Sequence, residues 1–188
     1  MSEGLANGSL PYHINEHVHR FAAWAASRAA STSTLRFSVA KGKDIIEVAR
    51  LRELSSGPDR LPQPEGMNAY HKQWRARVIE AAQSNGLVFS HGIAAKLINT
   101  YLKAALVTTA YHGDPRIGAL HPPIDRVLLD GLASSGLGSK SFWRTMRDVG
   151  WSNFSSEQYE DVIGAISKLQ EETERPLWAI EEHWRGYQ

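Results

Sequence analysis

Two short strings near the middle of the chain carry residues that could do chemistry together. Residues 91–96 read HGIAAK and residues 122–125 read PPID. We place Lys96 in the first turn of a helix, where the helix dipole disfavours a protonated amine and lowers the pKa of the lysine. A lysine with a lowered pKa is the kind of nucleophile that forms Schiff bases. The two prolines place the carboxylate of Asp125 at the start of the following helix.

Helical spacing predicts the elements that would hold these strings. Residues 93–109 repeat apolar side chains in pairs every four positions, which predicts a helix buried along one side. Another helix is predicted to begin near Asp125. Residues 68–84 form a predicted helix that Asn85-Gly86 would end. The catalytic candidates would therefore be held by two consecutive buried helices.

The N-terminal part predicts a long helix and then a loop. Residues 14–30 have a stripe at helical spacing that we expect to be buried, namely Ile14, Val18, Phe21, Ala22, Ala25 and Ala29. Residues 35–39 suit a short extended piece, and residues 44–54 suit a helix. Residues 55–66 contain three prolines and two glycines, which predicts a loop and a candidate boundary between two lobes.

The last third of the chain is also predicted to be helical. Residues 155–158 (SSEQ) form a capping box ahead of a predicted helix. Pro176 opens a short terminal helix that carries Trp178 and Trp184. The whole chain, residues 1–188, is predicted to be a single all-α domain of roughly seven to nine helices.

The composition excludes several classes of protein. With 42% hydrophobic and 22% charged residues among 188, the chain can bury a core and is not disordered. The absence of cysteine excludes a disulfide scaffold and a cysteine nucleophile. No apolar run approaches the roughly 20 residues of a membrane span, and the first residues lack a signal-peptide layout. We therefore expect a cytoplasmic protein that does not contact a membrane.

The net charge and the spacing of the histidines bear on whether the protein binds nucleic acid or a metal ion. The net charge is only +1, from 21 Lys and Arg against 20 Asp and Glu, so there is no basic excess of the kind common in nucleic-acid-binding domains. His13, His17 and His19 do not share one helix face and have no carboxylate pair to complete a site. We expect no metal and no cofactor.

Taken together, the two strings resemble the helix-hairpin-helix superfamily of base-excision DNA glycosylases, in particular its 8-oxoguanine DNA glycosylase branch. Residues 92–96 (GIAAK) are similar to the end of the hairpin that opens the helix of the catalytic lysine, and residues 123–125 (PID) are similar to the string of the essential aspartate. The resemblance covers residues 85–132. Ala94 stands where the hairpin has its second glycine, and the loop 109–121 is longer than the common form.

A narrower resemblance involves three strings. Residues 19–26 (HRFAAWAA), 94–99 (AAKLIN) and 121–125 (HPPID) look like the glycosylase-like accessory proteins of bacterial antiphage operons that encode a cyclic-oligonucleotide synthase (CBASS). This likeness implies a role in antiphage defence, with other proteins of the operon as partners.

The glycosylase resemblance implies a fold, a reaction and a set of residues. The fold would be a compact helical glycosylase domain, and the reaction would be excision of a modified base, with a purine expected, followed by strand nicking. Lys96 would attack C1′ of the sugar, and Asp125 would stabilise the developing positive charge. The expected DNA-backbone contacts are His91, Gly92 and Ala94. The expected base pocket is formed by Trp178 and Trp184.

Each of these residues also has a purely structural interpretation. Lys96 alone would be a solvated lysine on a helix, and Asp125 alone would be an N-cap. We expect His121 to be a structural hydrogen-bonding residue, and Trp74 to lie in the core. Two other classes of function stay open: a non-catalytic helical module that binds nucleic acid or a nucleotide, and a purely partner-binding protein of a defence complex.

Overall fold

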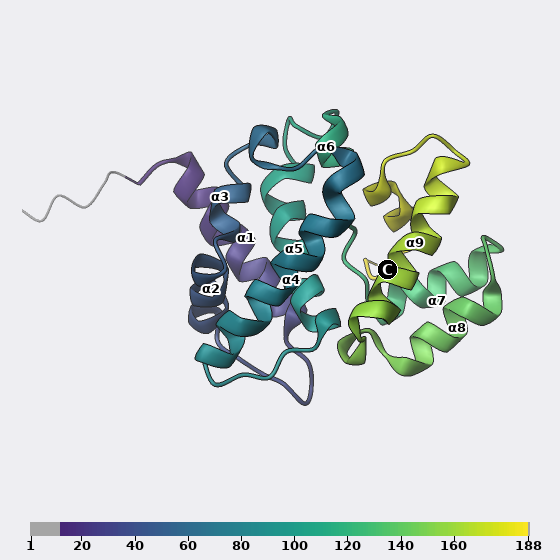
Figure 1. The fold of residues 1–188 in the computed structure, drawn as a ribbon, viewed down its shortest axis with the longest axis horizontal. Coiled ribbons are helices and arrows are strands. Elements are labelled where there is room, and N and C mark those ends of the chain that lie inside the picture. Colours follow the sequence, from purple (N-terminus) through teal and green to yellow (C-terminus); the bar gives the residue numbers. More distant parts are fainter. Residues whose placement is uncertain (1–11, 188) are drawn as a thin grey trace, which may run out of the picture.

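The computed structural model describes residues 12–187, which form an all-helical fold without a strand in that range (Figure 1). The predicted all-α class is confirmed. The longer helices are α1 (Ile14–Ala30), α2 (Val39–Val48), α4 (Met67–Ser84), α5 (His91–Leu102), α7 (Arg126–Ser135), α8 (Lys140–Val149) and α9 (Ser156–Glu171). The shorter ones are α3 (Leu51–Leu54), α6 (Pro115–Gly118) and the 3₁₀ segments η1 (Pro58–Arg60), η2 (Pro64–Gly66), η4 (Trp151–Asn153) and η5 (Leu177–His183). The π-helical η3 (Lys103–Val107) continues α5.

Local signals explain where several helices begin and end. Asp125 is the N-cap of α7, because its side chain accepts a hydrogen bond from the backbone N–H of Leu128. Ser155 and Gln158 form the predicted capping box at the start of α9. Gly86 has a φ of +73°, a left-handed conformation that favours glycine and stops the chain from continuing α4.

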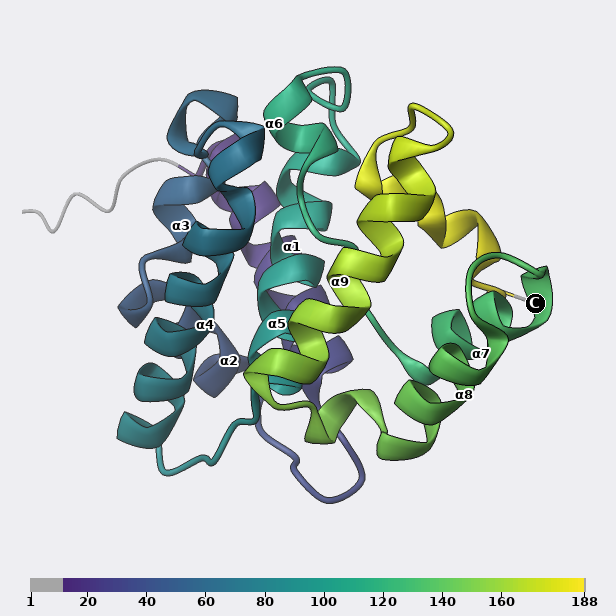
Figure 2. The same ribbon diagram turned by 45° about the vertical axis from the view of Figure 1, so that its right-hand side comes forward.

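The core consists of two hydrophobic clusters with α5 at their border. The first cluster is built on α1, α2, α4 and α5, and includes Trp74, as predicted, together with the buried stripe of α5. The second is built on α7, α8, α9 and η5, and α5 contributes Ala95 to it. Figure 2 shows the chain between α6 and α7 passing from one half of the molecule to the other. Residues before and after the segment 55–66 both belong to the first cluster, so the division between clusters does not fall at that segment.

The buried face of α1 differs from the predicted stripe. Ile14 and Phe21 are 70% and 58% exposed. The residues that α1 buries are small or polar: His19, Ala22, Ala23, Ala26, Ser27 and Ala30. Small side chains let neighbouring backbones approach closely. Helices α1 and α2 do so at Ser27 and Gly42, because a Cβ added to Gly42 would lie only 2.0 Å from the Ser27 hydroxyl oxygen. Ala22 of the predicted stripe is buried, whereas the prediction was wrong for Ile14 and Phe21, because close helix packing, and not side-chain hydrophobicity, selects this face.

Other boundaries also differ from the prediction. Residues 35–38 are irregular and pair with no strand, and α2 begins at Val39. The expected helix 44–54 is divided into α2 and α3, because Arg50 adopts a left-handed backbone with a φ of +60°. Helix α8 has no counterpart among the predicted helices. In the described part of the chain, no helix combines the length and apolar character that crossing a membrane requires.

Candidate active site

The Lys96 amine and the Asp125 carboxylate meet where the two halves of the molecule face each other. Lys96 extends from α5, and its Nζ donates to Oδ2 of Asp125 over 2.9 Å. The Trp184 Nε1–H donates to the same oxygen over 3.0 Å. The other oxygen, Oδ1, accepts the backbone N–H of Leu128 over 2.9 Å. The carboxylate is therefore held by three donors from three elements.

This pair opens onto a cavity of about 560 Å³. One wall is α1, which contributes a row of residues four positions apart, Phe21, Ala25 and Ala29. Trp151 and Trp184 line the cavity next to Lys96 and Asp125. The Lys96 Nζ lies 5.7 Å from the centre of the Trp151 ring. The cavity thus combines an amine and a carboxylate with flat aromatic surfaces. A larger hollow of about 750 Å³ near α6 and the end of α9 contains no lysine.

Burial sets the protonation behaviour of Lys96. Its side chain is only 8% exposed, and this desolvation lowers the pKa of the amine, while the adjacent Asp125 partly opposes the effect. The predicted position of Lys96 in the first turn was wrong: α5 begins at His91, so Lys96 lies in the second turn, where the helix dipole is weaker. Burial therefore supplies the lowered pKa that the dipole was expected to provide.

A second ion pair lies in the same cavity. Lys103 Nζ donates to the carboxylate of Glu181, and both residues line the cavity wall. Burial raises the pKa of Glu181, and Lys103 opposes this shift. Glu181 was not among the site residues predicted from the sequence. Lys103 lies seven residues after Lys96 on the same helical run, so helical periodicity could have indicated that the two lysines share a face.

A buried network positions the segment that carries Asp125. The Asn99 side-chain amide, one turn along α5 from Lys96, donates to the Pro122 carbonyl over 2.8 Å and to the Tyr159 hydroxyl over 3.0 Å. Its carbonyl oxygen accepts from His71 Nε2 over 2.7 Å. These bonds tie α5 directly to the residues just before Asp125.

His121 completes this network as a structural residue, as expected. Its Nδ1 is 3.0 Å from the Tyr159 hydroxyl, and its Nε2 is 2.9 Å from Oδ1 of Asn68. Burial lowers the pKa of His71 to about 3 and lowers that of His121 well below its ordinary value. Both rings are therefore neutral at pH 7, and each hydrogen bond of the network has a consistent donor and acceptor.

Two of the three expected backbone-binding residues, Gly92 and Ala94, are enclosed in the protein. Gly92 and Ala94 are buried, and the N–H of Gly92 donates to the Phe154 carbonyl. The N–H groups of residues 93 and 94 donate to the side chain and the carbonyl of Ser90, respectively. A Cβ on Gly92 would lie 1.7 Å from the Trp151 carbonyl oxygen, so this glycine permits close packing and does not form an open phosphate cradle. The three N–H groups that the hairpin would offer to a phosphate are already engaged.

The remaining predicted residues are separated by the structure. Trp184 lines the cavity, whereas Trp178 does not. His91 is half-buried at the start of α5, and burial lowers its pKa. Residues 12–187 contain no group of three or more His, Cys, Asp or Glu side chains arranged to hold a metal ion. The structure thus brings together Lys96, Asp125 and Trp184, and it adds Trp151, Phe21, Lys103 and Glu181 to them.

Comparison of the chain with protein-family models, curated proteins and solved structures found no match.

Proposed function

We propose that this protein is a lysine-dependent DNA N-glycosylase with lyase activity. The observation that carries the proposal is the buried amine of Lys96, 2.9 Å from the Asp125 carboxylate in a cavity that Trp151 and Trp184 also line. Desolvation lowers the pKa of Lys96 and so raises the fraction of neutral, nucleophilic amine, and flat aromatic walls suit a planar base. The resemblance of residues 92–96 and 123–125 to base-excision glycosylases supports the same reaction.

The proposed reaction begins with a nucleotide turned out of the base stack, since C1′ is shielded within stacked DNA. The neutral Lys96 amine forms a bond to C1′, and the base leaves with the electron pair of the glycosidic bond and takes up a proton. The carboxylate of Asp125 stabilises the positive charge that develops on the sugar. The amine then loses a proton, and the C1′–O4′ bond opens, with O4′ taking up a proton, to give a protonated imine. Removal of a proton from C2′ expels the 3′ phosphate and nicks the strand.

The fold gives Asp125 a fixed place in this reaction. One of its oxygens caps α7, and the other accepts from Lys96 and Trp184. A carboxylate held in this way does not have to reorient when charge develops on the sugar, which is the condition for effective electrostatic stabilisation. We extend the proposal to a modified purine as the excised base, and to antiphage defence together with other operon proteins, on the basis of the resemblance alone.

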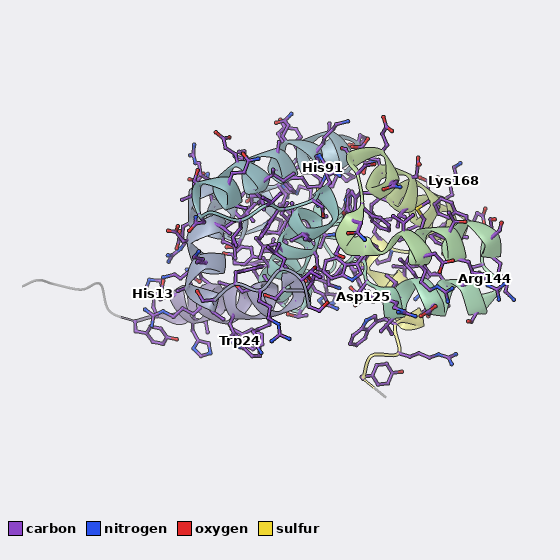
Figure 3. All side chains as sticks on the ribbon, turned by 90° about the horizontal axis from the view of Figure 1, so that it is seen from below. His13, Trp24, His91, Asp125, Arg144 and Lys168 are labelled. Carbon is purple, nitrogen blue, oxygen red and sulfur yellow. The ribbon has the colours of Figure 1, made fainter. Side chains whose placement is uncertain are left out.

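Borohydride trapping on an oligonucleotide with an aldehydic abasic site tests the proposal. Reduction of the imine would join the protein to the DNA covalently. The Lys96→Gln variant should give less than about 1% of the wild-type adduct, because the nucleophile is absent. Lys168→Gln is the matched control: Lys168 is an exposed lysine of α9 that does not line the cavity, and it lies well away from Asp125 (Figure 3).

Two outcomes would contradict the assignment. If the wild-type protein forms no adduct with any abasic oligonucleotide, the lyase reaction is not its function. If Lys96→Gln keeps the adduct and Lys103→Gln loses it, the nucleophile is the other lysine of the cavity. Melting temperatures of all variants show whether the loss of an adduct reflects loss of the fold, since Lys96 is buried.

One observation favours a second function, a non-catalytic module that binds nucleic acid or a nucleotide. The N–H groups of residues 92–94 are engaged within the protein, so the hairpin does not provide the backbone contact of a duplex-binding glycosylase. A cavity with two tryptophans and two lysines could hold a nucleotide without reacting with it. Saturable binding of an oligonucleotide or nucleotide, without adduct formation, would identify this function.

A further inference from the structure

An exposed aromatic edge of α1 adjoins the cavity. Phe21 and Trp24 are 58% and 52% exposed, and their ring centres are 5.9 Å apart. Phe21 lines the cavity together with Ala25 and Ala29, so the cavity wall continues along α1 as a row of residues four positions apart. The aromatic edge is therefore continuous with the candidate active site.

The neighbouring row of α1 alternates basic and aromatic residues. Arg20, Trp24 and Arg28 follow each other at intervals of four residues, and all three are exposed. Trp24 thus has an arginine one turn away on each side, and the two arginines are about 12 Å apart along the helix axis. Arg20 is paired with Glu16 over 2.7 Å. Within residues 12–187, no salt bridge of Arg28 is found, so its charge is available to a ligand.

The C-terminal segment has the same combination of residues beside the cavity. Trp184 lines the cavity, and the Tyr187 ring centre lies 6.4 Å from the Trp184 ring centre. Arg185 and Tyr187 are exposed. Figure 3 shows Trp24 and the last described residues of the C-terminal segment on the same side of the molecule, with Asp125 set back between the two halves. Aromatic residues of two segments, Phe21 and Trp184, therefore line the cavity, and exposed arginines lie near each of them in the sequence.

This chemistry matches an unpaired nucleic-acid strand. Aromatic side chains stack on bases of any sequence, and arginines placed among them contact the phosphates between those bases. The faces of the bases are covered in a duplex, so an aromatic edge gains little from paired DNA. The hairpin N–H groups are engaged within the protein, so they do not supply the phosphate contact of a duplex-binding hairpin.

We infer that single-stranded DNA docks on this aromatic edge, with Trp24 and Arg28 contacting the nucleotides that flank the one in the cavity. The inference rests on the proposed function, because that function places a nucleotide in the cavity. The strand would run along the exposed rows of α1, past Phe21, and reach the cavity beside Trp184.

Fluorescence anisotropy with a labelled oligonucleotide tests the inference. The oligonucleotide contains one tetrahydrofuran abasic analogue, which cannot form an imine, and is used both as a single strand and in a duplex. Trp24→Ala and Arg28→Ala should each weaken binding of the single strand by about fivefold or more. Arg28→Ala should also reduce the slope of log K against log salt by about 0.7, since one phosphate contact is lost. Trp24→Ala should leave that slope unchanged.

Tyr70→Ala provides the matched control, because Tyr70 is a 49% exposed aromatic residue of α4 that does not line the cavity. Its affinity for the single strand should equal that of the wild type. Equal affinity in the Trp24 and Arg28 variants would overturn the inference, as would tighter binding of the duplex than of the single strand. Loss of a wild-type dimer in Trp24→Ala, without any oligonucleotide binding, would instead assign the edge to contact between copies of the chain.

Trapping separates this inference from the proposed function. If the wild-type protein binds the single strand through Trp24 and Arg28 but never forms an adduct with an aldehydic abasic site, the docking surface stands and the glycosylase proposal fails. If the wild type forms the adduct and both variants bind the strand with wild-type affinity, the reaction stands and the docking surface fails.

Discussion

Asp125→Asn separates the structural role of this side chain from its chemical role. Asparagine caps helices nearly as well as aspartate, so the hydrogen bond from the Leu128 N–H to Oδ1 should survive. The second oxygen becomes an NH₂ group that faces two other donors. These are Lys96 Nζ and Trp184 Nε1, which lie 2.9 and 3.0 Å from Oδ2 in the wild-type protein.

The expected loss of stability follows from the burial of this pair. Removing one partner of a fully buried ion pair costs about 3–5 kcal/mol. Here Asp125 is 20% exposed, and Lys96 can release its proton because burial already lowers its pKa. The neutral amine can then accept a hydrogen bond from the asparagine. We expect the free energy of unfolding to fall by about 2 kcal/mol, or roughly 4–8 °C in melting temperature for a chain of this size.

The expected chemical effects have opposite signs in two assays. Loss of the carboxylate should slow single-turnover base excision about a hundredfold, because the charge on the sugar loses its electrostatic partner. It should also remove the interaction that raises the pKa of Lys96. The pH midpoint of borohydride trapping on a preformed abasic site should therefore move to lower pH, since more of the amine is neutral at a given pH.

Three measurements on Asp125→Asn distinguish a chemical role of Asp125 from a purely structural one: the melting temperature, the excision rate per folded molecule and the pH profile of trapping. If Asp125→Asn melts lower than the wild type while its excision rate is unchanged, Asp125 is only a cap and an ion-pair partner. If the trapping midpoint moves to higher pH, the amine that Asp125 contacts is not the reacting group.

Two further predictions concern the fold. Gly92→Ala should cost about 3 kcal/mol and lower the melting temperature by roughly 6–12 °C, because the added Cβ would lie 1.7 Å from the Trp151 carbonyl oxygen. Gly164→Ala is the control, since no atom lies within 4 Å of its added Cβ, and it should melt at or slightly above the wild type. Equal melting temperatures of the two variants would contradict the close packing at Gly92. His71 and His121 are neutral in the folded protein, and their folded pKa values lie below those of the unfolded chain. The unfolded chain therefore binds more protons below about pH 6.5, and stability should fall with decreasing pH by up to about 1.4 kcal/mol per pH unit for each histidine. Urea unfolding at pH 7.5, 6 and 5 measures this slope, and equal stability at the three values would refute the buried neutral network.

Local signals in the sequence determine most of the helices. The helical spacing of apolar residues predicts the bounds of α1, residues 14–30. The capping box predicts the start of α9, because the side chains involved are neighbours in the chain. Asp125 was predicted at the start of a helix for the same reason. These features depend on contacts within a few residues, which a single sequence displays directly.

The face that each helix buries depends on its partner. Hydrophobicity alone selected Ile14 and Phe21 of α1, whereas the structure buries alanines and a serine where α2 packs closely. The same holds for Gly92, whose missing Cβ makes room for the Trp151 carbonyl and not for a phosphate. Close approach between elements is a property of their pairing, so the pattern of one helix does not reveal it.

The candidate active site shows the same division between sequence and tertiary structure. Lys96 and Asp125 were recognised from short strings that resemble a known family, and helical position gave the wrong cause for the lowered pKa of Lys96. Only the fold shows that the amine is buried, that Trp184 shares its carboxylate partner, and that Glu181 lines the same cavity. Burial and charge pairing depend on residues far apart in the chain, so tertiary structure alone decides the chemistry available at this site.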